Sequence, residues 1–216
     1  MRSKTIVASL LFVVPILTQT TPDGFLLVAN KTLDVYYGGQ YISPGTLVKK
    51  SVTQKMPVIG LTNTTLPGKY LLAMIDIDVT QNGRPTTVLH ALLQDYTPSG
   101  AVQNGTAVLA TTATGPSSYF GPAPPAGAPP THRYVFLLHE QPANFAVPPA
   151  HRQAVSSRFG IDWSGFIADA GLKAPLAGNY LQNMLFVNGA QEHAGTWMHD
   201  TDGARDDGSK TGDVGR

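Results

Sequence analysis

The apolar residues of this chain fall in short runs that are separated by glycine, proline and asparagine. Runs of roughly four to ten residues that are rich in Val, Leu, Ile and Tyr and bounded by turn residues are typical of β-strands. The pattern predicts strands over five segments: Phe25–Val28, Leu33–Tyr37, Tyr70–Val79, Thr87–Leu93 and Tyr134–His139. The sequence QNGR at 81–84 predicts a turn, because Asn-Gly accepts positive φ angles.

One helix is clearly indicated late in the chain. Apolar residues with the spacing i, i+3, i+4, i+7 begin at Trp163 and end at Ala170; Asp162 precedes them as a cap and Gly171 follows them. A second, shorter helix is predicted over about 150–158. With 22 Gly and 17 Pro, a long-helix or coiled-coil protein is excluded, and the pattern predicts one mostly β domain.

Composition and charge narrow the function classes. Hydrophobic residues make up 42% and charged residues 13% of the chain, which is too apolar for wholesale disorder. The formal net charge of +1 gives no general electrostatic attraction to nucleic acid or to anionic membrane, so neither is an expected partner. The absence of cysteine excludes disulfides, thiolate metal sites and a thiol nucleophile.

The two ends are predicted to lie outside the fold. Residues 1–20 have the features of a signal peptide, in which Arg2 and Lys4 precede the apolar run Ile6–Leu17. That run is shorter than the roughly 20 residues that span a bilayer, so no transmembrane segment is predicted. The polar residues 200–216 are predicted to form a disordered tail, because they hold no large apolar side chain.

Three N-x-S/T sequons support passage through the secretory lumen or secretion. They begin at Asn30, Asn63 and Asn104, each in a polar, turn-like context. We therefore expect these three asparagines to be glycosylated in a mature chain that begins near Thr21.

Two acidic residues end the predicted strand over 70–79. Because alternate residues of a strand share a face, Asp76 and Asp78 are expected to point to one side and Ile77 to the other. Two carboxylates at the end of an apolar strand are costly to bury unless they find donors. This segment alone leaves two possibilities open, a pair of solvated acids and a polar site.

A proline- and glycine-rich loop precedes the strand that begins at His132. By alternation His132 and Tyr134 share one face and Arg133 takes the other. Gly121 permits close approach of backbone N–H groups, and the prolines limit the entropy lost on binding, which suits a small anion pocket. His90, inside an apolar strand, is by itself more typical of a core histidine with one hydrogen bond than of a ligand.

The segment Tyr119–Pro142 resembles the signature of the phosphatidylethanolamine-binding protein family, with Gly-Pro-x-Pro-Pro-x-Gly followed by His-Arg-Tyr-Val-Phe-Leu-Leu-x-Glu-Gln-Pro. Asp76-x-Asp78 with the later Leu89-His90 is similar to the family's Asp-Pro-Asp-Ala-Pro…Leu-His block. The run PLAGNY at 175–180 is similar to its Pro-Val-Ala-Gly-Asn-Phe motif. The three blocks follow the family's order and cover about residues 25–185, within a domain expected over 21–199.

The resemblance implies a mainly β fold, an antiparallel β-sheet sandwich with a few short helices near the C-terminus. It also implies a solvent-open pocket that accepts phosphate-like or carboxylate groups. Carried over by position, the ligand-binding residues are Asp76, His90, Tyr119, Gly121, Pro124, His132 and Tyr134. In that pocket each imidazole can donate an N–H to an anion, Asp76 can fix a histidine tautomer, and the phenols can donate O–H groups. Asp78 and Arg133 are expected to be structural neighbours of the site.

The chain departs from the family pattern around this pocket. Both prolines of the acidic block are replaced in Asp76-Ile-Asp-Val-Thr80, and Ala91 stands where an aromatic residue often follows Leu-His. The loop before His132 is one residue longer than usual. These changes indicate a rebuilt pocket wall, and with it a changed ligand.

Three functions remain open, and no catalytic residue, metal or cofactor is predicted. The first is binding of a small anionic molecule or a phospholipid head group. The second is an accessory or catalytic role beside a biosynthetic enzyme, in a fungal-type pathway that couples polyketide anhydrides or carboxylates. The third is inhibition of a serine protease or carboxypeptidase. Hydrolase motifs such as Gly-x-Ser-x-Gly and His-Glu-x-x-His are absent, and the six histidines lack helical ligand spacing.

Overall fold

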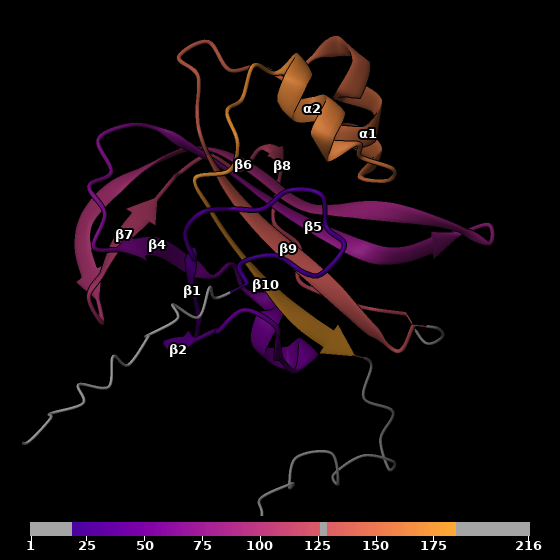
Figure 1. The fold of residues 1–216 in the computed structure, drawn as a ribbon, viewed down its shortest axis with the longest axis horizontal. Helices are drawn as coiled ribbons and strands as arrows, with labels where there is room; N and C mark the ends of the chain where they lie inside the picture. Colours follow the sequence, from indigo (N-terminus) through magenta and orange to yellow (C-terminus); the bar gives the residue numbers. More distant parts are fainter. Residues whose placement is uncertain (1–18, 126–128, 185–216) are drawn as a thin grey trace, which may run out of the picture. The chain divides into compact units, whose positions relative to one another are not determined.

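The computed structural model describes residues 19–125 and 129–184. Ten strands, two α-helices and two 3-10 helices make up this part of the chain (Figure 1). In chain order they are β1 (Asp34–Tyr37), β2 (Gln40–Tyr41), β3 (Thr46–Leu47), η1 (Lys50–Gln54), β4 (Val58–Thr62), β5 (Tyr70–Gln81), β6 (Arg84–Gln103), β7 (Thr106–Ala110), β8 (Pro116–Ser117), β9 (Thr131–Glu140), η2 (Pro149–His151), α1 (Arg152–Ser157), α2 (Trp163–Asp169) and β10 (Ala177–Met184).

One long strand, β6, joins the two halves of the sheet. The strand order is β2-β1-β4-β7-β6-β5-β9-β10-β3, with β8 beside β6. The first part of β6, up to Tyr96, pairs with β5, and the part from Thr97 onward pairs with β7. All pairs are antiparallel except β10 with β3. Because β6 serves both halves, the smaller half can pack face to face against the larger one.

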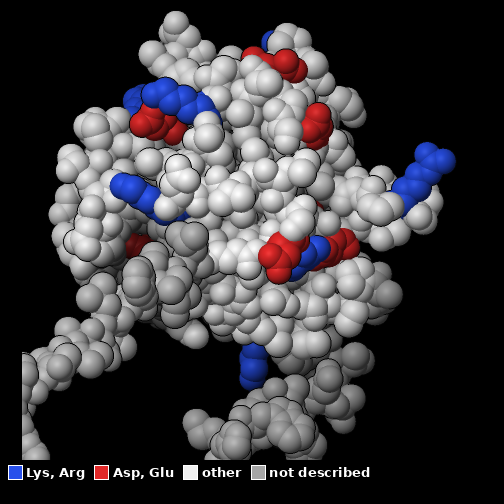
Figure 2. All heavy atoms as spheres, viewed as in Figure 1, with Lys and Arg blue, Asp and Glu red and all other residues white. Residues whose placement is uncertain are grey.

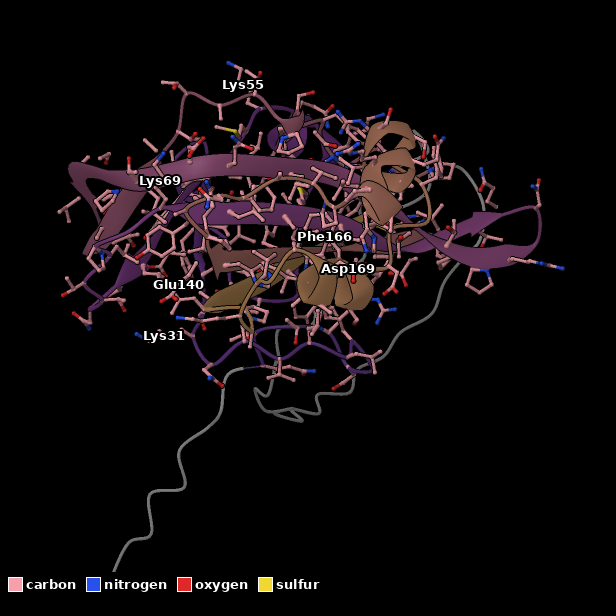
Figure 3. All side chains as sticks on the ribbon, turned by 90° about the horizontal axis from the view of Figure 1, so that it is seen from above. Lys31, Lys55, Lys69, Glu140, Phe166 and Asp169 are labelled. Atoms are coloured by element: carbon pink, nitrogen blue, oxygen red, sulfur yellow. The ribbon has the colours of Figure 1, made fainter. Side chains whose placement is uncertain are left out.

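Two apolar cores cover the two faces of the larger sheet. In β5, Leu72 and Met74 pack in the core between the two halves of the sheet, whereas Leu71 and Ile75 pack in the core beneath the helices. Phe166 of α2 is fully buried in the second core, where it stacks on Trp163 with ring centroids 4.6 Å apart. Figure 3 labels Phe166 on this helix together with Asp169. A strand buried on both faces gives a continuous apolar sequence run, as β5 does.

The mainly β fold and most predicted elements are confirmed. The strands predicted near 33–37, 70–79, 87–93 and 134–139 correspond to β1, β5, β6 and β9, although β6 is much longer than predicted. The turn at 82–83 has φ angles of 52° and 74°, as Asn-Gly permits. The first predicted helix is α2, whose cap Asp162 accepts a hydrogen bond from the N–H of Gly165 at 3.0 Å. The second is η2 with α1.

The strand predicted over Phe25–Val28 is wrong. Its residues alternate as in a strand, since Phe25 and Leu27 pack against the core beneath the helices while Leu26 is 88% and Val28 70% exposed. Within residues 19–125 and 129–184 no strand forms a hydrogen-bonded ladder with residues 25–28, so their backbone remains irregular. Alternation of apolar residues indicates that one side of a segment is buried, but it does not indicate that a neighbouring strand pairs with the segment.

The surface agrees with the weak net charge. Figure 2 shows Lys and Arg interspersed with Asp and Glu on the face in view. None of the helices within residues 19–125 and 129–184 is long and apolar enough to cross a bilayer.

The predicted tail and residues 1–18 of the predicted signal peptide lie outside the described residues. Thr20, the last residue of the predicted signal peptide, is buried, and its hydroxyl donates to the carbonyl of Ala29 at 2.8 Å. The sequon residues Asn30, Asn63 and Asn104 are all exposed.

Candidate functional site

Polar side chains gather at one end of the core between the two halves of the sheet. Asp76 of β5 lies directly opposite Tyr134 of β9, and His132 comes two residues earlier on the same face of β9. Met74 and Phe136, the next residues along these faces, are buried in the core. The face of β5 and β9 that is apolar in the core therefore becomes polar at this end of the two strands. We call four residues the polar cluster: Asp76, His90, His132 and Tyr134.

A buried acid–imidazole pair lies at the centre of the polar cluster. Nδ1 of His132 lies 2.8 Å from Oδ2 of Asp76, and each residue is 3% exposed. Oδ1 of Asp76 accepts the backbone N–H of Asp78 at 3.0 Å. Burial raises the pKa of Asp76, while the hydrogen bonds from Asp78 and His132 oppose that rise. Because the carboxylate fixes the proton on Nδ1, Nε2 is the nitrogen of His132 that a ligand can meet.

His90 reaches the polar cluster through a β-bulge. On one side of it Met74 pairs with Ala91, and on the other Ile75 pairs with Leu89, which leaves His90 as the extra residue of β6. A bulge breaks the strict alternation of a strand and re-aims the extra side chain. This irregularity brings an imidazole from β6 toward the side chains of β5 and β9.

Phe120 covers the imidazole of His90. The two rings stack with centroids 3.9 Å apart, and Phe120 is 37% exposed whereas His90 is 3% exposed. The carbonyl of Phe120 accepts a hydrogen bond from Nδ1 of His90 at 3.0 Å, and the N–H of Phe120 donates to the carbonyl of His90 at 3.0 Å. The His90 ring also lies at 86° to the Tyr134 ring, with centroids 5.0 Å apart. The buried imidazole thus contacts two aromatic rings.

These contacts determine the protonation of His90. Because a carbonyl oxygen only accepts, Nδ1 carries the proton and Nε2 presents a lone pair. Burial lowers the pKa of His90 to about 4; the hydrogen bond to Phe120 opposes this, and the charges of Arg158 and His132 add to it. The imidazole is therefore neutral at pH 7. The expectation that both imidazoles donate an N–H to an anion does not hold for His90, whose second nitrogen is an acceptor.

The two tyrosines of the predicted site differ in what their hydroxyls do. The hydroxyl of Tyr119 donates to the carbonyl of Thr53 and lies 2.9 Å from the hydroxyl of Tyr37, so it is committed to packing η1 and β1 together. The hydroxyl of Tyr134 is buried and makes no hydrogen bond of ordinary geometry in the described part of the chain, although the carboxylate of Asp76 and the backbone N–H of Ala123 lie near it. Burial and the nearby charge of Asp76 raise the pKa of Tyr134, which keeps this phenol protonated. Tyr134 is the phenol that can donate to a ligand.

The loop that follows Tyr119 is braced against η1. A side chain at Gly121 would come within 2.6 Å of the carbonyl oxygen of Thr53, so only glycine permits this approach. The amide of Gln54 donates to the carbonyl of Pro122 at 3.0 Å, and Pro124 is buried. Residues 126–128, which include the second glycine of this loop, lie outside the described residues.

Asp78 and Arg133 form a separate ion pair beside the polar cluster. Oδ2 of Asp78 accepts the backbone N–H and Nε of Arg133, both at 2.8 Å, and Oδ1 accepts Nη2 at 2.6 Å. Burial alone would raise the pKa of Asp78, but the bonds and charge of Arg133 outweigh it and hold the pKa below its usual value. The two carboxylates of the acidic block thus have different partners. Asp78 fixes the start of β9, which carries His132.

The structure encloses the polar cluster more than the resemblance implies. Tyr134 is fully buried and the other three residues are nearly so, whereas an open pocket was expected. Two surface hollows lie elsewhere, one at the turn between β5 and β6 near Arg84 and one beside α1 near Arg152. Within residues 19–125 and 129–184 no group of three metal-ligating side chains converges.

Sequence reasoning missed three residues around the polar cluster. Phe120 lies within the quoted signature, but nothing in the pattern shows that its ring stacks on His90. Arg158 donates to the carbonyl of Ser118 at 2.8 Å and places its guanidinium 5.0 Å from the Phe120 ring centroid. Asn183 of β10 lies directly opposite His132. Alternation along the PLAGNY segment could have found Asn183, but only once β10 was known to pair with β9.

Comparison with known proteins places these features in a family. The family model described as phosphatidylethanolamine-binding protein matches residues 29–187. The chain is 36% identical over 117 residues to "Phomoidride biosynthesis cluster protein N" of Talaromyces stipitatus, covering 52% of this chain and 57% of that protein. A protein of the same name from Fungal sp. (strain ATCC 74256) is 35% identical over 120 residues, covering 53% of this chain and 52% of that protein. The chain thus spans about half the length of these relatives.

A solved structure shares the fold. The crystal structure of carboxypeptidase Y inhibitor complexed with the cognate proteinase matches with a TM-score of 0.53 and 19% identity, covering 73% of this chain and 85% of that chain. At this identity the likeness concerns the fold alone.

Proposed function

The chain belongs to the phosphatidylethanolamine-binding protein family, and from this premise we propose that it binds a small molecule through a phosphate or carboxylate group at the polar cluster. The group can belong to a free acid or to a lipid head group, which share this chemistry. The observation that carries the proposal is the Asp76–His132 pair beside the buried hydroxyl of Tyr134, which faces Asp76 and Ala123 without a hydrogen bond of ordinary geometry in the described part of the chain.

The chemistry of these groups supports an acid as ligand. Oδ2 of Asp76 lies against Nδ1 of His132, so the carboxylate supplies the counter-charge to any imidazolium that forms when an acid binds at Nε2. The Tyr134 hydroxyl supplies a second donor in a desolvated position, where an unmade hydrogen bond costs about 1–3 kcal/mol. A bound acid oxygen would satisfy both donors. Buried polar groups without partners are uncommon in proteins, and a ligand is one explanation of such a group.

Access to the polar cluster is proposed to involve Phe120. Its ring separates His90 from solvent and is itself more than one-third exposed. A rotation of this side chain uncovers the His90 imidazole without breaking the backbone bonds between Phe120 and His90. The braced segment around Gly121 stays in place during this movement.

Calorimetry tests the proposal. We expect inorganic phosphate, phosphoethanolamine or a small dicarboxylate to bind more tightly than about 1 mM, which corresponds to roughly −4 kcal/mol. The double substitution His90→Ala with His132→Ala should abolish this binding and leave a folded protein. His151→Ala is the matched control, because His151 also pairs with a carboxylate, Asp169 at 2.8 Å, but lies away from the polar cluster. Absence of binding by all three compounds would refute the proposal.

A second candidate is a role beside the enzymes of a biosynthetic cluster. The names of the two fungal relatives favour it, since both are called biosynthesis cluster proteins. In that role the polar cluster would hold a carboxylate or anhydride-derived unit for a partner enzyme. Genes for polyketide synthesis next to the gene of this chain would support it, and their absence would count against it.

Protease inhibition is the third candidate, and a shared fold alone supports it. Inhibition of a carboxypeptidase or serine protease that survives the double histidine substitution would separate this activity from the polar cluster.

A further inference from the structure

Asn183 adds an acceptor to the polar cluster. It lies directly opposite His132 in the β9–β10 pair, and its neighbour along the same face, Leu181, packs in the core between the two halves of the sheet. Directly opposed residues of a sheet point to the same face with Cβ atoms about 5 Å apart. Asn183 is fully buried, and its Nδ2 donates to the carbonyl of Val48 at 2.8 Å. Its Oδ1 has no hydrogen-bond partner within the described residues.

The polar cluster therefore offers acceptors as well as donors. Nε2 of His90 presents a lone pair, because Nδ1 uses the proton of the neutral ring toward Phe120. Oδ1 of Asn183 is a second acceptor that never carries a proton. On the donor side stands the Tyr134 hydroxyl, together with Nε2 of His132 when that imidazole is charged.

This mixture suits only some acid groups. A fully deprotonated group such as sulfate has acceptor oxygens only, and these would satisfy Tyr134 but face the lone pairs of His90 and Asn183. A phosphate monoester with one negative charge carries both P–O⁻ oxygens and a P–OH group. It can accept from Tyr134 and donate to an acceptor at the same time. A carboxylic acid that keeps its proton has the same capacity.

We propose that the polar cluster selects acid groups that retain a proton, and that Asn183 and His90 supply the acceptors that read this proton. The proposal rests on the proposed function and specifies its ligand class as monoprotonated phosphate monoesters and protonated carboxylic acids. The retained proton pairs one of the two acceptors, which a ligand without the proton leaves unpaired. An unpaired buried acceptor costs about 1–3 kcal/mol, so we expect a preference of about 10- to 100-fold.

Two compounds of the same shape isolate this proton. At a pH of about 5.5, below the second pKa of a phosphate ester near 6, O-phosphoethanolamine and ethanolamine O-sulfate carry the same charges and differ by one O–H. Calorimetry should show the phosphate ester binding at least about tenfold more tightly. Equal affinities would overturn this inference and leave the proposed function standing. If neither compound binds, this inference fails, and the proposed function fails as well only when inorganic phosphate and the dicarboxylate also do not bind.

The ratio of the two affinities is also the readout for Asn183. Asn183→Leu removes the acceptor, so the ratio should fall at least threefold, whereas Asn183→Asp keeps an acceptor and should preserve or increase it. Both ligands carry the same charge, so repulsion by the new carboxylate cancels in the ratio. Asn179→Leu is the control, since Asn179 is equally buried on β10 but lies opposite Phe136. An unchanged ratio in a folded Asn183→Leu protein would refute the role of Asn183.

Discussion

Nδ1 of His132 and Oδ2 of Asp76 meet across 2.8 Å in a position almost closed to solvent. Within residues 19–125 and 129–184 no arginine or lysine pairs with Asp76, and its carboxylate is stabilised by the imidazole of His132 and by the backbone N–H of Asp78. Burial still raises its pKa. The charge of this carboxylate therefore costs the fold stability at neutral pH.

Asp76→Asn should separate binding from stability. An acid whose folded pKa is raised contributes stability below its unfolded pKa of about 3.9, and this contribution is lost as the pH rises through the folded pKa. At pH 7 the wild type has lost it, so the neutral asparagine should cost no more than about 1 kcal/mol of unfolding free energy. Phosphoethanolamine should bind about 10- to 100-fold more weakly, because bonds that involve charged groups contribute about 1.5–3 kcal/mol.

Urea denaturation at pH 7 and calorimetry check this prediction. Asp169→Asn is the control, because Asp169 pairs with His151 outside the polar cluster and its loss should leave ligand affinity unchanged. A fall of several kcal/mol in the stability of the Asp76→Asn protein at pH 7 would show that the pair is mainly structural.

His90 should make the protein acid-sensitive. A base whose folded pKa is lowered contributes stability above its unfolded pKa of about 6.5, and loses it as the pH falls through the folded pKa, which is about 4 for His90. The shift corresponds to at most about 3 kcal/mol. His90→Asn keeps a donor toward the carbonyl of Phe120 but does not titrate. We therefore expect the stability difference between wild type and variant to change between pH 6.5 and pH 4.

Denaturation curves of both proteins across this pH range measure the effect. Burial also lowers the pKa of His139 and raises the pKa of Asp76, so both residues change the stability with pH. Both are present in wild type and in His90→Asn, and their contributions cancel in the stability difference between the two proteins. Parallel stability profiles of wild type and His90→Asn would contradict the prediction.

The two strands that bear most of the polar cluster, β5 and β9, could be predicted from the sequence. They are buried on both faces, and each therefore has a continuous apolar run. Alternation then placed His132 with Tyr134. Alternation predicted that Asp76 and Asp78 share a face, yet their carboxylates bind different residues of β9, His132 and Arg133. Alternation predicts the face of a side chain, but it does not predict which neighbouring residue the side chain binds.

Other features depend on pairing and could not be read from one segment. His90 enters the cluster because β6 has one residue more than β5 at that point, a property of two strands together. Asn183 became relevant only through its position opposite His132. The strand predicted at Phe25–Val28 was wrong for the same reason, since its alternation was correct but no strand of the described chain pairs with it.

Gly121→Ala should weaken the packing of the loop on η1. The added methyl would lie 2.6 Å from the carbonyl oxygen of Thr53 and 2.9 Å from Cα of Gln54, both backbone atoms that cannot swing away. Overpacking of this kind costs about 1–3 kcal/mol, measurable as a lower midpoint of thermal unfolding. Gly68→Ala is the control, because no atom lies within 4 Å of its added methyl, and it should change stability by less than about 0.5 kcal/mol. Equal midpoints for the two variants would contradict the close approach.

The exposed sequons predict a glycosylated product. Secreted material from a eukaryotic host should exceed the polypeptide mass, fall in mass on glycosidase treatment, and lose one step with each of Asn30→Gln, Asn63→Gln and Asn104→Gln. The asparagine is the residue to change at the third sequon, because its threonine, Thr106, is buried and donates to Asp34 at 2.9 Å. A product with the bare polypeptide mass and an intact Met1 would refute both secretion and glycosylation.

Arg158 should help to hold Phe120 over His90 and should contribute, after burial, to the low pKa of His90. Its guanidinium lies over Phe120, donates to Ser118 and bears a charge that lowers the pKa of His90. Arg158→Gln removes the charge and should raise the pKa of His90 from about 4 toward its ordinary value of about 6.5. It should also speed hydrogen exchange at the N–H of Phe120. Arg152→Gln on α1 is the control and should leave both quantities unchanged.

Arg158→Lys distinguishes the two effects of this residue. Lysine keeps the positive charge but has no planar fork for Ser118 and Phe120. If the fork holds the cover in place, exchange at the Phe120 N–H should rise as much as in Arg158→Gln, while the pKa of His90, followed by NMR titration, should shift less. Slow exchange in the lysine variant would mean that charge alone, and not the shape of the guanidinium, keeps Phe120 over the imidazole.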